Sequence, residues 1–167
     1  ACTVGKSAVK SGMTDIRIEY ARAHDAAAIE ALLRAAFEQQ DEADLVAALR
    51  RDGAIWVEWV ATTGTTIVGF AALSRMRAPD GWACLAPVAV QPEHQNQGIG
   101  GALTRRAAGF DQADAVVVLG DPQFYGHHGF DHARAQKLFS PYPVSHTLIA
   151  GGARSPEATL IYPAAFG

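Results

Sequence analysis

Apolar and polar positions alternate at the start of the chain and then take up helical spacing. Residues 15–21 alternate isoleucine and tyrosine with polar neighbours, a pattern typical of a strand with one buried face. Apolar side chains recur on one helical face through residues 24–37, with Asp25 as the expected N-cap. Residues 41–53 predict a second helix, because acidic residues come first, arginines last, and a glycine closes the segment.

Beyond residue 53 the pattern becomes that of a sheet. Glycine and Pro-Asp-Gly turn signals separate three apolar, β-branched and aromatic segments, which predict an antiparallel meander over residues 54–63, 66–77 and 81–90. A glycine-rich loop, a helix over residues 98–111 and an apolar strand over residues 114–120 follow. Strand, helix and strand in this order predict a βαβ crossover, so the last strand should lie parallel to the third segment.

The last part of the chain is less regular. It predicts a short helix around residues 121–128 and β-like pieces near residues 130–139, 144–149 and 158–162. The whole pattern predicts an α/β fold, in which helices cover both faces of a mixed, mostly antiparallel sheet with one parallel crossover.

Composition and charge narrow the class of protein. The chain has 167 residues, 49% of them hydrophobic, and a formal net charge of −3. We expect one domain over residues 13–167 after a polar, disordered leader over residues 1–12 that lacks the apolar core of a signal peptide. The charge argues against a nucleic-acid partner, and no apolar run approaches the ~20 residues of a membrane span. Cys2 and Cys84 fit no disulfide or metal-ligand spacing, so the sequence predicts a cytoplasmic protein without a metal. Cys84 is expected to be a small buried hydrophobic residue.

Three glycines crowd the start of the helix predicted over residues 98–111, where glycine is unfavourable: Gly98, Gly100 and Gly101. A helix start offers free N–H groups and the positive end of the helix dipole, and bare backbone lets phosphate oxygens come close. We therefore interpret residues 97–102 as a phosphate or pyrophosphate cradle rather than a tight turn. A dinucleotide fingerprint does not fit, because Leu103 stands where its third glycine should be, and the lysine of a nucleoside-triphosphate loop is missing.

Two motifs resemble those of the GNAT superfamily of N-acetyltransferases. Residues 95–100 fit its Q/R-x-x-G-x-G/A signature, and residues 124–130 resemble its xYxxxGF segment. The joint match spans residues 81–131, and the closing "YPAAF" looks like one bacterial branch of predicted acetyltransferases. The resemblance implies a GNAT-like fold that holds acetyl-CoA (coenzyme A) between two splayed strands. Pro87 suits a bulge at which those strands part, since it cannot donate to a sheet, although a local kink without a ligand is the alternative.

The resemblance also assigns roles to residues. The backbone along Val88, Ala89 and Val90 would pair with the pantetheine arm, with the N–H of Val90 near the thioester carbonyl. The pyrophosphate would be held by the main-chain amides of Gln95, Asn96, Gln97, Gly98, Ile99, Gly100 and Gly101. Tyr125, four residues before Gly129, would act as general acid toward the departing thiolate, with an aromatic packing role as the alternative.

The general base is not evident from the sequence. Many relatives place a glutamate on or near the fourth strand or use a water chain, but residues 82–90 contain no carboxylate. Glu93 and His94 follow that strand, where they could equally be exposed loop residues. His127 and His128 are adjacent, so they cannot form a paired metal site on a helix, and one of them could shuttle a proton.

The predicted function is transfer of an acetyl group from acetyl-CoA to a primary amine of a small molecule or peptide, by direct attack in a ternary complex. The alternative is a non-catalytic acyl-CoA-binding or partner-binding module, and a dinucleotide enzyme is a distant third. The protein would be a monomer or homodimer. The resemblance implies that the acceptor would contact residues 24–53 and 131–162. Acids there that could attract a cationic amine, or simply be solvated, are Glu30, Glu38, Asp41 and Glu42.

Overall fold

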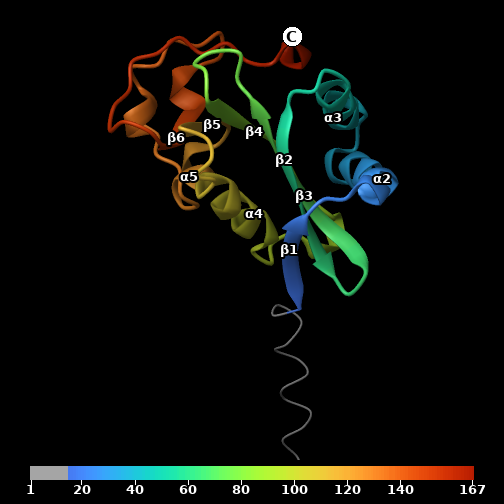
Figure 1. The fold of residues 1–167 in the computed structure, drawn as a ribbon. Helices are drawn as coiled ribbons and strands as arrows, with labels where there is room; N and C mark the ends of the chain where they lie inside the picture. The colour runs from blue at the N-terminus through green and yellow to red at the C-terminus, as the bar shows by residue number, and fades with distance from the viewer. Residues whose placement is uncertain (1–14) are drawn as a thin grey trace, which may run out of the picture.

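The computed structural model describes residues 15–167, which form a six-stranded sheet with helices packed against it (Figure 1). The strand order is β1-β2-β3-β4-β5-β6, and each neighbouring pair is antiparallel except β4 and β5, which are parallel. The predicted mixed sheet with one parallel crossover is therefore confirmed. The predicted leader over residues 1–12 lies outside the described residues.

The elements follow the predicted order closely up to the fifth strand. The strands are β1 (Ile16–Tyr20), β2 (Ile55–Thr63), β3 (Thr66–Arg75), β4 (Trp82–Val90), β5 (Ala115–Leu119) and β6 (Thr147–Gly151). The α-helices are α2 (Ala26–Phe37), α3 (Asp41–Arg51), α4 (Ile99–Ala108) and α5 (Pro122–Gly126). Short 3₁₀ turns are η1 (Ala23–Asp25), η2 (Pro92–His94), η3 (Ala133–Ala135), η4 (Val144–His146) and η5 (Ala164–Phe166).

Asp25 does not cap α2 as predicted. Its carboxylate accepts a hydrogen bond of 2.8 Å from the backbone N–H of Arg22 and so closes the turn η1, while no side chain caps α2. The polar residue at the start of the helical pattern is satisfied by the preceding turn, because α2 continues directly from η1.

The C-terminal region differs from the sequence prediction. The pieces predicted at residues 130–139 and 158–162 are not strands and pair only through isolated bridges, and residues 133–135 form η3. The piece predicted at residues 144–149 begins with η4, and β6 starts only at Thr147. Prolines at positions 141 and 143 cannot donate backbone hydrogen bonds, which delays the strand until they are passed.

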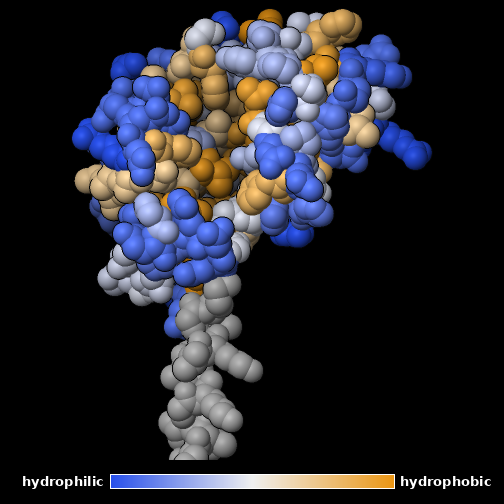
Figure 2. Space-filling view, turned by 180° about the vertical axis from the view of Figure 1, so that it is seen from behind, coloured by the Kyte–Doolittle hydropathy of each residue, from blue (hydrophilic) through white to orange (hydrophobic). Residues whose placement is uncertain are grey.

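Alternate residues of the central strands pack on opposite faces of the sheet. Phe70 and Ala72 of β3 lie in a core cluster with Leu32 of α2, whereas Ala71 and Leu73 lie in a second cluster with Leu103 of α4. The prediction of helices on both faces is thus confirmed. Seen from behind, the middle of the molecule is hollowed, and hydrophobic residues gather in the hollow (Figure 2). None of the helices in residues 15–167 is long and apolar enough to cross a membrane.

β4 changes its pairing halfway along. Its parallel pairing with β5 runs only from Trp82 to Leu85. Toward β3, Leu85 pairs with Leu73 and Val88 pairs with Ala71, so Ala86 and Pro87 together oppose a single residue. Two residues facing one constitute a β-bulge, which bends the strand. The bulge predicted at Pro87, and the parting of the two parallel strands, are both present.

Candidate functional site

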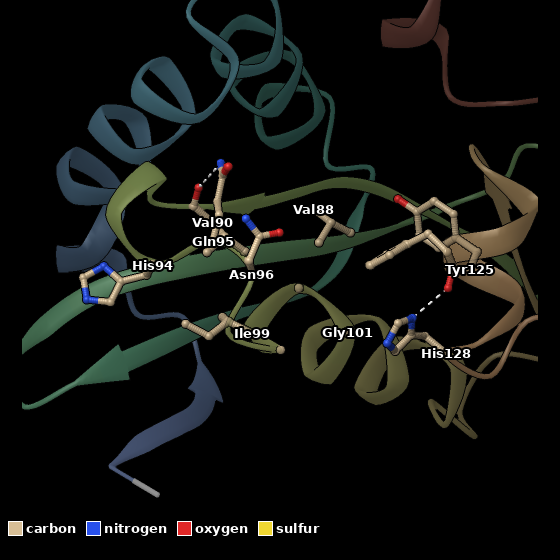
Figure 3. Close-up of a pocket in the computed structure, with 12 residues that line it drawn as sticks. Val88, Val90, His94, Gln95, Asn96, Ile99, Gly101, Tyr125 and His128 are labelled. Atoms are coloured by element: carbon tan, nitrogen blue, oxygen red, sulfur yellow. Dashed lines mark hydrogen bonds between the residues drawn. The ribbon is translucent and has the colours of Figure 1, made fainter. Parts of the chain in front are cut away.

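A cavity of about 390 Å³ lies where β4 leaves β5, between β4, the start of α4 and α5 (Figure 3). Its lining comes from two parts of the chain that are far apart in the sequence, residues 88–101 and residues 124–128. The lining residues are Val88, Val90, His94, Gln95, Asn96, Gly98, Ile99, Gly100, Gly101, Phe124, Tyr125 and His128.

The edge of β4 next to the cavity has backbone groups that no neighbouring strand pairs with. The N–H of Gln91 donates to Val68 of β3 at 2.8 Å, and successive residues of a strand turn their backbone groups to opposite edges. Val88 and Val90 therefore turn their N–H and C=O groups away from β3, toward the edge that β5 no longer covers. The side-chain amide of Gln95 donates to the Val90 carbonyl at 3.2 Å, which agrees with this direction. Such an edge can pair with an extended ligand as a sheet pairs with a strand.

The start of α4 is bare backbone. Gly98 is the N-cap with a φ of 84°, a left-handed conformation that favours glycine, and no side chain of the described residues caps the helix. A Cβ on Gly100 would lie 3.6 Å from Val90 and 3.8 Å from Phe124, which are ordinary contacts, so the fold itself tolerates a side chain there. A side chain at position 100 would occupy cavity space in front of the first N–H groups of the helix. The residues present thus suit an anion that must approach the backbone closely.

Most of the predicted site residues meet in this cavity, and two do not. Ala89 is buried on the opposite face of the sheet, among residues that pack on α2, because it alternates with Val88 and Val90. Gln97 is exposed and does not line the cavity. The backbone N–H of Gln95 already donates to the Pro92 carbonyl at 3.4 Å. Gln95 therefore lines the cavity with its side chain, and its backbone N–H is not free for a ligand.

Tyr125 is fixed by the way α5 begins. Asp121 caps the helix by accepting from the N–H of Gln123 at 2.9 Å, and the chain turns out of β5 at this point. A Cβ added to Gly120 would overlap the Tyr125 ring, so the ring rests directly on this glycine. Burial raises the pKa of the Tyr125 phenol above its ordinary value of 10.0. The phenol therefore stays protonated at neutral pH, and Figure 3 shows its hydroxyl on the side of the ring toward Val88.

Three lining residues had no assigned role in the predicted site: His94, Phe124 and His128. Of these, His94 and His128 were considered only as possible proton carriers. The sequence contained a usable signal for two of them, because Phe124 and His128 are four residues apart and share one side of a helical turn. Their rings are in contact, with centroids 4.6 Å apart and planes tilted by 38°. His94 lies at the opposite end of the cavity in Figure 3, and its Nδ1 is buried without a hydrogen-bond partner among the described residues.

The remaining candidate residues lie outside the cavity. Glu93 is exposed and does not line it. Cys84 is buried in the sheet, as predicted, and burial raises the pKa of its thiol to about 12. Of the acids considered for an amine acceptor, Glu30 pairs with Arg34 on the surface of α2. This pairing favours the interpretation of a solvated helix face.

Comparison with known proteins agrees with the fold and the cavity. Residues 52–132 match the model of the acetyltransferase (GNAT) domain. The chain is 36% identical over 128 residues to the uncharacterized N-acetyltransferase YhbS of Escherichia coli K12, covering 71% of this chain and 75% of that protein. The protein therefore belongs to the GNAT family of N-acetyltransferases.

Two solved structures show how similar the fold is. GNAT family N-acetyltransferase YhbS from E. coli in complex with CoA superimposes with a TM-score of 0.80 and 31% identity, covering 91% of this chain and 92% of that chain. A GNAT family acetyltransferase from Brucella melitensis in complex with acetyl-CoA gives a TM-score of 0.74 and 32% identity, covering 91% and 98%.

Proposed function

We propose that the protein binds acetyl-CoA in the cavity between β4, α4 and α5 and transfers the acetyl group to a primary amine of a small molecule or peptide. The observation that carries the proposal is that an open strand edge, a bare helix start and a half-buried phenol line one cavity. The complexes of similar GNAT structures with CoA and acetyl-CoA support the same ligand.

Binding would rest mainly on the backbone. The N–H groups from Asn96 to Gly101 would hold the diphosphate, with the α4 dipole directed at it. The open edge from Val88 to Val90 would pair with the pantetheine arm, and the N–H of Val90 would donate to the thioester carbonyl, where negative charge develops during attack.

Transfer of the acetyl group from a thioester to an amine requires one proton donor and one proton acceptor. The amine nitrogen attacks the thioester carbon, the C–S bond breaks, and Tyr125 donates its proton to the departing sulfur. Its raised pKa keeps the phenol in the donor form. None of the described residues that line the cavity is a carboxylate. The amine would give up its proton to water.

A panel of amines with detection of released CoA tests the proposal directly. The panel would include polyamines, amino acids, aminoglycosides and peptide N-termini. Acetyl-CoA should raise the thermal stability of the protein, because a ligand that binds only the folded state stabilises it. Release of CoA with an amine supports the enzyme. Binding without release for any amine would favour the acyl-CoA-binding module, and no binding would refute both. A cytoplasmic location and a monomeric or homodimeric state remain predictions.

A further inference from the structure

His128 lines the cavity but has no part in the mechanism above. Its Nδ1 lies 2.7 Å from the carbonyl oxygen of Phe124, one helical turn earlier. A carbonyl can only accept a hydrogen bond, so Nδ1 carries the proton that is shared. In the neutral ring, Nε2 then has a lone pair and no hydrogen. It becomes a donor only when the ring takes up a second proton.

The other ring nitrogen is held against the first turn of α4. A Cβ added to Gly101 would overlap Nε2 of His128, and Figure 3 shows the imidazole between α5 and this turn. Gly101 does not have a positive φ, and the acetyltransferase signature ends at Gly100, so neither turn geometry nor the signature demands a glycine here. The absent side chain at position 101 is what lets the imidazole reach the start of α4.

We infer that His128 is a further ligand-binding residue: it takes up a proton when the diphosphate of the CoA ligand binds at the start of α4, and its Nε2–H then donates to a phosphate oxygen. This inference rests on the proposed function. A neutral ring would present a lone pair to the anion, whereas the charged ring offers a charge-assisted hydrogen bond.

The charges around His128 couple the proton to the ligand. Tyr125 on the same helix is a neutral phenol, and Asp121 lies at the far end of α5, engaged in its cap. Arg105 of α4 donates to the carbonyl of His127 at 2.8 Å, and its positive charge opposes an imidazolium nearby. His94 lines the same cavity, and an imidazole carries no negative charge. The ligand's diphosphate is therefore the counter-ion that makes the charged ring favourable.

Calorimetry with 3′-dephospho-CoA measures this proton. The 3′-phosphate of CoA itself titrates near pH 6, as phosphate monoesters do, so the dephosphorylated ligand removes that contribution. Titrations at pH 7.5 in buffers with different ionisation enthalpies give the number of protons taken up. We expect net uptake, and a Kd that tightens as the pH falls from 8 toward 6. A single proton limits the change to about tenfold per pH unit.

Two matched variants distinguish the outcomes. His128→Gln should abolish proton uptake and make the Kd independent of pH, whereas His94→Gln, a histidine at the other end of the same cavity, should keep both. Proton uptake that persists in His128→Gln would overturn the inference. The inference would also be overturned if His128→Gln lost as much affinity for pantetheine, which has no diphosphate, as for 3′-dephospho-CoA. Wild-type binding without proton uptake overturns this inference alone, whereas no binding of the ligand overturns the proposed function as well.

Discussion

Both halves of β4 consist of apolar residues, yet only one of them has a neighbouring strand on each side. From Trp82 to Leu85 the strand pairs with β3 on one side and β5 on the other. From Val88 to Val90 it pairs with β3 alone. The side chains of the closed half are buried from Ala83 onward, whereas Val88 and Val90 are half-buried and line the cavity.

The difference arises from where each neighbour stops. A bulge at Ala86 and Pro87 bends β4, and β5 ends at Leu119, where Gly120 leads into the cap of α5. Helix α5 follows β5 at this point and places Tyr125 beside the edge of β4 that β5 leaves unpaired. This half of the strand therefore has backbone hydrogen-bonding groups that the sheet leaves unused, next to the half-buried phenol of Tyr125.

The largest effect is expected from removing the phenol next to the open half. Tyr125→Phe should lower kcat by about 100- to 10,000-fold, the usual contribution of a general acid, while the Kd for acetyl-CoA stays nearly unchanged. Steady-state kinetics and calorimetry measure the two quantities separately. Tyr142→Phe is the control, because that hydroxyl donates to the Phe166 carbonyl and does not line the cavity. An unchanged kcat in Tyr125→Phe would leave the tyrosine only a packing role.

Shortening one side chain in each half should separate stability from binding. Leu85→Ala removes buried atoms from the core next to α4 and should lower the free energy of unfolding by about 2–5 kcal/mol. Val88→Ala should cost only about 1 kcal/mol, because the half-buried valine loses less contact. Urea unfolding of both variants checks this difference. Equal losses would mean that the open half is packed as tightly as the closed one.

Local sequence patterns were sufficient for most of the fold. The strands and helices from β1 to β5 were predicted because apolar periodicity is strong there and glycines or prolines mark the ends. The segments around Phe139 and Thr159 could not be assigned correctly, since they meet through an isolated bridge rather than a ladder. Short apolar runs do not reveal whether a partner strand exists.

The backbone features that line the cavity could be predicted from the sequence. The contacts between side chains from distant parts of the chain could not. The glycines indicated a helix start without a side-chain cap, and Pro87 indicated the parted strands; the structure has both. The position of Ala89 follows from the two-residue period of a strand and could have been excluded from the lining. The contact of His128 with Gly101 depends on how α5 packs on α4, which no local pattern encodes.

A smaller loss of rate is expected from disturbing the seat of the tyrosine. Gly120→Ala would place a Cβ in the space of the Tyr125 ring, so the ring must shift from its position. We expect kcat to fall about tenfold with little change in KM for acetyl-CoA, because misplacing a reacting group by a fraction of an ångström affects mainly the chemical step. Gly126→Ala is the matched control, since a Cβ there meets nothing within 4 Å. If both variants lose the same rate, the effect comes from α5 as a whole.

The smallest effect concerns the closed half, where Cys84 should be inert. Burial raises the pKa of its thiol to about 12, so the folded protein holds it protonated and away from reagents. A Cys2→Ser variant, which leaves Cys84 as the thiol of the chain, should not react with Ellman's reagent until denaturant is added. Because the folded pKa is raised, the associated stability is complete below about pH 9 and is lost as the pH rises toward 12. Cys84→Ala should flatten this alkaline decline, and rapid labelling of the native thiol would show that β5 does not seal this half of the strand.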